Sequence, residues 1–286
     1  MRRSVTTVVC WNICKRSAPW NELLAMDADV ALLQEAGKVP PDLPSSIDTG
    51  SITTTGDRWN DLVDFKSWPL VVKLSDRVKV EWFKRVLPLY RSTGPDEMVV
   101  SDVGTIAAAR VIPREQEPFI VVSMYSRWLR PHSSTSTKWV AGYSDASTHR
   151  IISDLSAFIG DLDSSTHRIL AAGDLNTVLG STDTKLVLPD RDRMVFERMD
   201  ALGLEFMGPQ HPDGRQTIPT PSGLPENTRN VPTFYAPKAK TPENAVHQLD
   251  YVFASRGFHS SLRVRALNDP DEWGSSDHCR ILIEVS

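Results

Sequence analysis

The sequence predicts a single α/β domain. Strand-like and helix-like patterns alternate along its 286 residues, and the chain holds 40% hydrophobic and 24% charged residues, the composition of an ordinary globular protein. No repeat, low-complexity tract or clear linker divides it. We therefore expect one domain over residues 1–286, with long loops gathered at one end.

The first three elements predict a parallel pair of strands. Val5 to Cys10 is apolar and β-branched, as in a buried strand, and Val30 to Gln34 is a second run of this kind. Between them, Pro19 to Asp27 has a helical pattern with a proline near its start, where helices accept one. A strand, a helix and a strand within about 30 residues form a βαβ unit, so the two strands should be parallel near neighbours.

The rest of the chain continues this alternation. Further strands are expected at Leu70–Lys73, Val78–Arg85, Thr105–Val111, Phe119–Tyr125, Ile169–Ala172, Leu249–Ala254 and Ile281–Val285. Ser147–Ile159 and Met194–Leu202 have helical patterns, the first with its apolar side chains on one face. Residues 38–60 and 208–245 are rich in residues that favour turns, so both are expected to be irregular.

Composition and charge exclude several classes of protein. No apolar run approaches the ~18 residues of a membrane span, and the apolar stretch near the N-terminus is too short for a signal peptide. The three cysteines, Cys10, Cys14 and Cys279, are too few for a disulfide framework and lack the partners of a zinc site. A net charge of -4 argues against a protein that coats nucleic acid by bulk charge, while a local basic patch is compatible with it. We expect a cytoplasmic protein that contacts no membrane; no protein partner is indicated, and a monomer is the expectation.

Polar side chains stand at or near the ends of several predicted strands. They are Asn12, Glu35, Asp174, Asn176, Asp250, Asp277 and His278. A single acidic residue there is ordinarily a turn residue or a helix cap, but several of them together with a histidine indicate a site. Asn12, Glu35 and Asp277 offer oxygen ligands with two negative charges, which suits Mg²⁺ or Mn²⁺ rather than zinc.

The remaining four residues suit phosphoryl chemistry. Asp250 could pair with His278, fixing the tautomer of the imidazole and favouring its protonated form. Asp174 could orient or deprotonate an attacking water, and Asn176 could donate a hydrogen bond to the transition-state oxygen. The residue types therefore indicate metal-dependent hydrolysis of a phosphate ester.

Five short blocks also make the sequence recognisable. They are Cys10-Trp11-Asn12, Leu33-Gln34-Glu35, Gly173-Asp174-Leu175-Asn176, Leu249-Asp250-Tyr251 and Ser276-Asp277-His278. In this order they resemble the endonuclease/exonuclease/phosphatase superfamily, the group that contains deoxyribonuclease I and exonuclease III, from about Val5 to the C-terminus. The resemblance implies a four-layered α/β/β/α sandwich, with two packed mixed β-sheets flanked by helices and the site at one end.

The same resemblance implies roles for the seven polar residues. They match the family's metal site, its pair that handles the water and the phosphate, and its Asp–His catalytic dyad, in agreement with the chemistry above. Tyr125, at the end of a predicted strand, resembles the tyrosine that many members place near the phosphate. The alternative for Tyr125 is an aromatic residue that packs on the rim.

The substrate is less specified, because this fold and metal site serve DNA, RNA, phosphoinositides and sphingomyelin. Thr177-Val178 follows the Gly-Asp-Leu-Asn block. Inositol-polyphosphate phosphatases usually have an aromatic–Arg pair there, and abasic-site endonucleases similar to exonuclease III usually have Ala-His soon after it, so both branches are disfavoured. Sphingomyelinase-like enzymes are secreted or membrane-associated, and neither a signal nor an amphipathic anchor is visible.

A basic and aromatic segment favours a nucleic-acid substrate. Between residues 127 and 150 the single acidic residue Asp145 is accompanied by basic and aromatic residues, namely Arg127, Arg130, Lys138, Arg150, Trp128, Trp139 and Tyr143. The basic groups, above all Arg127, Arg130 and Lys138, would neutralise backbone phosphates, and the rings would stack on bases or wedge a groove. The alternative is a solvated loop whose rings pack against the domain.

We therefore expect a Mg²⁺- or Mn²⁺-dependent phosphodiesterase, in first place an endonuclease that acts on DNA. The alternative is a phosphatase or phosphodiesterase for a small phosphorylated metabolite or lipid headgroup, which a compact pocket closed by residues 208–245 would favour. A protein that only binds its ligand would have lost a catalytic residue, and all seven are present.

Overall fold

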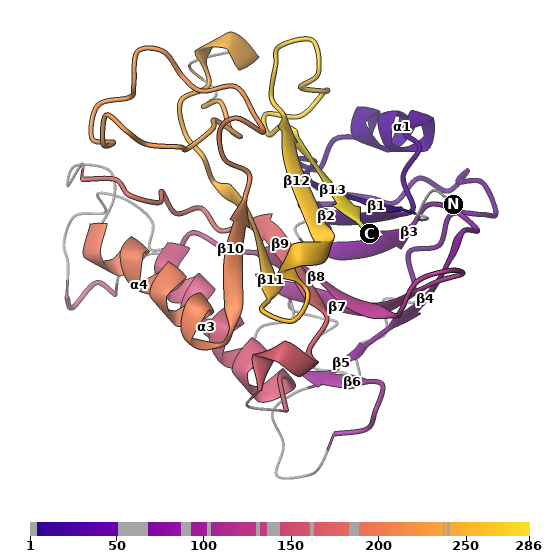
Figure 1. Cartoon of the computed structure of the whole chain (residues 1–286). Coiled ribbons are helices and arrows are strands. Elements are labelled where there is room, and N and C mark those ends of the chain that lie inside the picture. Colours follow the sequence, from indigo (N-terminus) through magenta and orange to yellow (C-terminus); the bar gives the residue numbers. More distant parts are fainter. Residues whose placement is uncertain are drawn as a thin grey trace.

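A computed structural model describes residues 5–50, 68–86, 93–101, 104–129, 132–135, 144–160, 163–182, 189–236, 238 and 241–286. Most of its strands form two sheets that pack face to face (Figure 1). The first sheet has the spatial order β12 (Leu262–Leu267), β13 (Arg280–Val285), β1 (Thr6–Asn12), β2 (Val30–Gln34) and β3 (Leu70–Lys73). The second has the order β10 (Leu204–Gly208), β11 (Asp250–Ser255), β9 (Ile169–Asp174), β8 (Phe119–Tyr125), β7 (Ile106–Pro113) and β4 (Val78–Trp82). A small parallel pair, β5 (Lys84–Val86) with β6 (Glu97–Val99), lies apart from them.

Both large sheets are mixed. In the first sheet β1 and β2 are parallel, with Val8 opposite Val30, as the βαβ pattern predicted. In the second sheet β8 and β9 are parallel, with Ile120 opposite Ile169. The other neighbours in both sheets are antiparallel.

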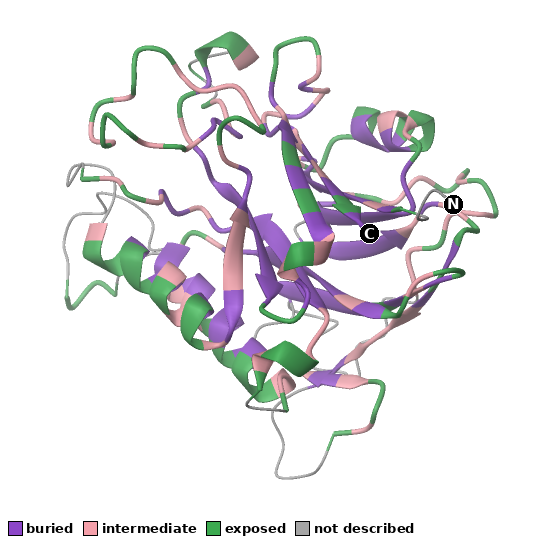
Figure 2. Cartoon of the chain, viewed as in Figure 1, coloured by how far each residue is buried: buried purple, intermediate pink, exposed green. Residues whose placement is uncertain are grey.

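Side-chain alternation along the strands builds the layers. Val8 and Cys10 of β1 point between the sheets, while Val9 and Trp11 point outward against α1 (Ala18–Ala25), because successive residues of a strand face opposite sides. The outer face of the second sheet is covered in the same way by α3 (Ser144–Phe158) and α4 (Pro189–Ala201). Figure 2 shows the buried strands between helices whose outer faces are exposed. The predicted four-layered sandwich is confirmed.

The predicted strand Val78–Arg85 was wrong as one element. The chain leaves the second sheet after β4, at Phe83, and enters β5, which pairs with β6. Phe83 turns its ring onto Phe158 of α3, with the ring centroids 5.1 Å apart, so apolar packing interrupts a run that looks continuous in sequence. The strands β6, β10 and β12 were also not predicted.

The segment 209–249 is irregular in its described residues, as expected, apart from the short 3₁₀-helix η3 (Pro242–Asn244). Two further short 3₁₀-helices are η2 (Ser164–Thr166) and η4 (His259–Ser261). Among the described residues, each helix is too short or too polar to cross a bilayer. Cys10, Cys14 and Cys279 are free thiols.

Candidate active site

Strand register brings the polar residues to one end of the sandwich. In the second sheet Tyr125, Asp174 and Asp250 stand in one row across β8, β9 and β11, because Asp174 is paired with both neighbours. In the first sheet Asn12, the last residue of β1, is paired with Gln34 at the end of β2. The two sheets therefore deliver these side chains to the same edge from facing layers.

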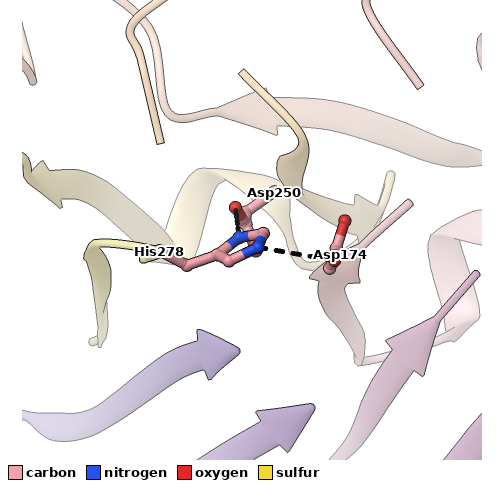
Figure 3. A group of neighbouring side chains, drawn as sticks. All are labelled: Asp174, Asp250 and His278. Carbon is pink, nitrogen blue, oxygen red and sulfur yellow. Dashed lines mark hydrogen bonds and ion pairs between the residues drawn. The ribbon is translucent and has the colours of Figure 1, made fainter. Parts of the chain in front are cut away.

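The centre of this cluster is a histidine between two aspartates (Figure 3). His278 Nδ1 donates a hydrogen bond of 2.8 Å to Asp250 Oδ2, and its Nε2 faces Asp174 Oδ2 at 3.8 Å. All three residues are buried. Their potential ligand atoms lie within 4.8 Å of one another, a spacing that could hold a metal ion only with a neutral imidazole, since a doubly protonated ring has no lone pair to offer. The ring of Phe234 packs on the imidazole, with its centroid 4.8 Å away.

Burial and mutual charge shift the titration of this group. Burial raises the pKa of Asp174 to about 7, with the nearby charge of Asp250 adding to the effect and that of His278 opposing it. Burial alone would lower the pKa of His278, but the charges of Asp250 and Asp174 outweigh it and raise that pKa to about 10. At neutral pH the imidazole is therefore cationic, and Asp174 titrates near the pH at which a general base is most effective.

Two asparagines hold the Asp174 carboxylate. Asn12 Nδ2 donates to Asp174 Oδ2 at 2.9 Å, and the backbone N–H of Asn176 donates to Oδ1 at 2.8 Å. Asn176 Nδ2 donates to the carbonyl of Ser126 at 2.8 Å and approaches Asp174 Oδ2 at 3.2 Å. The carboxylate is thus fixed between the two sheets, and these bonds favour its ionised form against the effect of burial.

Glu35 lies beside this group in contact with Tyr125. The Tyr125 hydroxyl donates to Glu35 Oε1 at 2.8 Å, and Lys15 Nζ lies 3.6 Å from Glu35 Oε2. Burial, together with the charge of Glu35, raises the pKa of Tyr125 well above its ordinary value, so the phenol stays protonated and keeps donating. Tyr125 is therefore a partner of the acidic cluster, beyond simple packing on the rim.

Asp277 joins the site from the segment before β13. Its neighbour Ser276 donates from Oγ to the backbone carbonyl of Asn12 at 2.7 Å, which ties the two segments together. The thiol of Cys14 lies close to Asp277, and burial together with that negative charge raises the pKa of Cys14 to about 11. Cys14 is therefore a neutral neighbour of the acidic residues.

Several residues of the site also have a strained backbone conformation. Among the described residues, those other than glycine with a left-handed φ are Cys14 (50°), Lys15 (59°), Glu35 (44°) and Asn176 (50°). A left-handed conformation costs roughly 1–2 kcal/mol for most residues, with asparagine more tolerant, and such strain concentrates at functional sites. The loops after β1 and β2 support one another in this geometry, since the N–H of Lys15 donates to the carbonyl of Glu35 at 2.7 Å.

The predicted phosphate-binding residues are only partly placed. Arg127 is described: its backbone N–H donates to Ser147 Oγ at 3.0 Å, and its guanidinium packs over Gly104, where no Cβ would fit. Arg130 and Lys138 lie outside the described residues. Trp11 and Trp273 are fully buried near the site, and Trp11 Nε1 donates to the carbonyl of His278 at 2.8 Å.

Two residues that contribute to the site, Thr233 and Lys15, were not predicted from the sequence. Thr233 Oγ1 donates to Asp250 Oδ2 at 2.7 Å and accepts the N–H groups of Leu249 and Asp250, so it orients the carboxylate that holds His278. Thr233 lies within an irregular segment rich in proline and threonine, where no pattern marks it. Lys15 was also missed, although its place three residues after Asn12 offered a weak signal of positive charge at the site.

Comparisons with known proteins identify the family and the fold. The sequence profile of the endonuclease/exonuclease/phosphatase family matches residues 10–278. A search by sequence against curated proteins finds no significant match. Similar folds include the AP endonuclease LMAP from Leishmania major, with a TM-score of 0.60 and 16% identity over 98% of this chain and 87% of that one.

Two further structures are similar over nearly the whole chain. The catalytic domain of APE2 from Xenopus laevis has a TM-score of 0.60 and 18% identity over 97% of this chain and 91% of that one. The 3′-5′ exonuclease NExo from Neisseria meningitidis has a TM-score of 0.57 and 15% identity over 98% and 100%. At 15–18% identity these structures show that the fold is similar. The family is shown by the sequence profile, which matches nearly all of the chain. The chain belongs to the endonuclease/exonuclease/phosphatase family.

Proposed function

We propose that this protein is a divalent-metal-dependent nuclease that hydrolyses phosphodiester bonds, with DNA as its substrate. The observation that carries the proposal is the buried cluster in which His278 stands between Asp250 and Asp174 at the shared edge of the two sheets. A cationic imidazole beside a carboxylate of near-neutral pKa can bind a phosphate and accept a proton from water.

Each residue of the cluster has a distinct role in the proposed hydrolysis. The 3.8 Å separation between His278 Nε2 and Asp174 Oδ2 leaves this ring nitrogen free to donate to a phosphate oxygen. Asp174 accepts a proton from the attacking water, and Asn12 and Asn176 keep its carboxylate aimed. Asp250 stabilises the imidazolium and fixes its orientation, since a carboxylate only accepts and the Nδ1–H must face it.

The donor set fits Mg²⁺ or Mn²⁺. Asn12, Glu35 and Asp277 contribute amide and carboxylate oxygens, the ligands that hard divalent cations prefer. Asp250 Oδ1 is buried and has no hydrogen-bond partner among the described residues, which leaves a further oxygen for an ion or water. When bound, the cation would polarise the phosphoryl group and balance its developing negative charge.

Site surroundings favour a nuclease over an enzyme for small phosphoesters. His211, Val246 and several residues between 216 and 232 line a cavity of about 310 Å³. None of the catalytic cluster is among the residues that line it, so this cavity does not close over the phosphate position. Around the cluster lie the basic side chains of Lys15, Arg16 and Arg127, which can neutralise a backbone phosphate on either side of the cut. Relatives of the same fold include an AP endonuclease and a 3′-5′ exonuclease.

Nicking of supercoiled plasmid DNA in Mg²⁺ or Mn²⁺ tests the proposal. We expect nicking that requires the metal and is lost in His278→Ala. His149→Ala is the matched control, because His149 is a half-buried histidine on α3 that contacts Arg198 away from the site, and it should nick normally. A folded wild type that binds metal and leaves plasmid intact would contradict the DNA substrate, and a phosphate-release panel with RNA and small phosphoesters would follow.

A further inference from the structure

Trp128 stands out as an exposed aromatic residue fastened to the site. Among the described residues it is the one large aromatic side chain classed as exposed, with 50% of its surface open to solvent. Its indole Nε1 donates to Asn176 Oδ1 at 2.9 Å. A single exposed apolar side chain is ordinary, but this one is hydrogen-bonded to a residue of the catalytic cluster.

The backbone beneath Trp128 is anchored. The N–H of Ser126 donates to the carbonyl of Asp174 at 2.8 Å, and the N–H of Arg127 donates to Ser147 Oγ on α3. These two bonds join the segment to β9 on one side and to α3 on the other. The indole therefore projects from a fixed support.

In the hydrogen bond between Trp128 and Asn176, only one assignment of donor and acceptor is possible. An indole N–H can only donate, so it requires the amide oxygen of Asn176, and the carbonyl of Ser126 can only accept, so it requires Nδ2. Both partners select the same orientation of the amide. That orientation turns Nδ2 towards Asp174 Oδ2, at 3.2 Å.

We propose that Trp128 is a positioning and specificity residue: its N–H orients the Asn176 amide, and its exposed ring stacks on a nucleobase beside the phosphate that is cut. This inference rests on the proposed nuclease function and adds a preference to it. In a nucleic acid each phosphate is flanked by a flat base, and an exposed indole ring beside the site suits such a base. Bases inside a duplex are already stacked on both faces, so the platform favours an unpaired or frayed strand.

Two variants separate the two roles. Trp128→Phe keeps a ring and loses the N–H, so kcat on a short single-stranded oligonucleotide should fall about 2- to 12-fold, the worth of one hydrogen bond, with KM nearly unchanged. Trp128→Leu loses both features, so the same fall in kcat should be joined by a rise in KM of about 5- to 150-fold, the worth of one stacked base. A merely structural role would not divide kcat from KM in this way.

Stacking also has a readout that needs no cleavage. An oligonucleotide that carries 2-aminopurine should lose fluorescence when it binds the wild type in Ca²⁺, and this quenching should disappear in Trp128→Leu. Trp82→Phe is the matched control, because the Trp82 indole donates a bond of 2.8 Å to the carbonyl of Val71, far from the site, and its loss should leave kcat, KM and quenching unchanged.

The outcomes are distinguishable. Wild-type kcat in a folded Trp128→Phe overturns the orienting role, and equal KM values for the Phe and Leu variants overturn the stacking role. A wild type that cleaves no nucleic acid overturns the proposed function itself, whereas wild-type cleavage with unchanged variants overturns the role of Trp128 alone.

Discussion

Replacing Asp250 by asparagine tests the buried pair most directly. Asp250→Asn keeps the size of the side chain and removes its charge. In the native protein Oδ2 accepts one bond from the His278 imidazole and one from the Thr233 hydroxyl. The variant retains an acceptor for Thr233 but no longer stabilises the imidazolium, so the change acts on the histidine and spares the neighbouring backbone.

The size of the effect follows from the contact. A hydrogen bond to a charged group is worth about 1.5–3 kcal/mol, which corresponds to a fall in kcat of about 10- to 150-fold. The loss should be at the upper end, because both residues are buried and water cannot replace the missing charge. Asp250→Asn should also lower the Tm, because the buried imidazolium loses the carboxylate that compensates its charge, so rates are compared at a temperature where the variant is folded.

The assay is the rate of plasmid nicking at saturating metal, with a thermal melt of each variant. His278→Ala and the double variant complete a cycle: once His278 is gone, Asp250→Asn should cost almost nothing more. Asp154→Asn is the matched control, since Asp154 is a buried acceptor on α3 that serves Ser101, and its kcat should stay at the wild-type value. A folded Asp250→Asn with wild-type kcat, or additive losses in the cycle, would refute the pairing argument.

Three further outcomes are expected. Glu35→Gln should raise the Mg²⁺ concentration for half-maximal rate at least about 10-fold, and an unchanged metal titration would remove Glu35 from the metal site. Tyr125→Phe loses one hydrogen bond to Glu35 and should lower the rate about 2- to 12-fold; full activity would return Tyr125 to a packing role. The metal-free protein should lose stability in thermal melts as pH rises from about 6 to about 10. Folding raises the pKa of Asp174 to about 7 and that of His278 to about 10. Over this range the folded state therefore holds protons that the unfolded state has released, and raising the pH favours unfolding. A Tm that rises over this range would contradict the burial of both groups.

Much of the fold could be predicted because local sequence patterns specify its strands and helices. The parallel pair β1 and β2 follows from two β-branched runs and a short helix between them, and the structure has β2 at the predicted residues. Strand β12 was not predicted, although its Leu-Arg-Val-Arg alternation is the pattern of a half-buried strand, and in the structure it pairs with β13. At Phe83 the error was of another kind: the segment Val78–Arg85 has the pattern of one strand, but packing of Phe83 against α3 divides it into two.

The sequence by itself determined the layered α/β fold, the family and the identities of the polar residues at the strand ends, because these depend on residue type and short-range order. Only the tertiary structure decided which of them touch: the register of β8, β9 and β11 sets Tyr125, Asp174 and Asp250 in one row, and the facing sheet supplies Asn12. Thr233 and Trp128 acquire partners in the site through contacts between segments far apart in the chain. The titration of His278 and Asp174 also depends on burial and on the distances between charges, which exist only after folding brings the two sheets together.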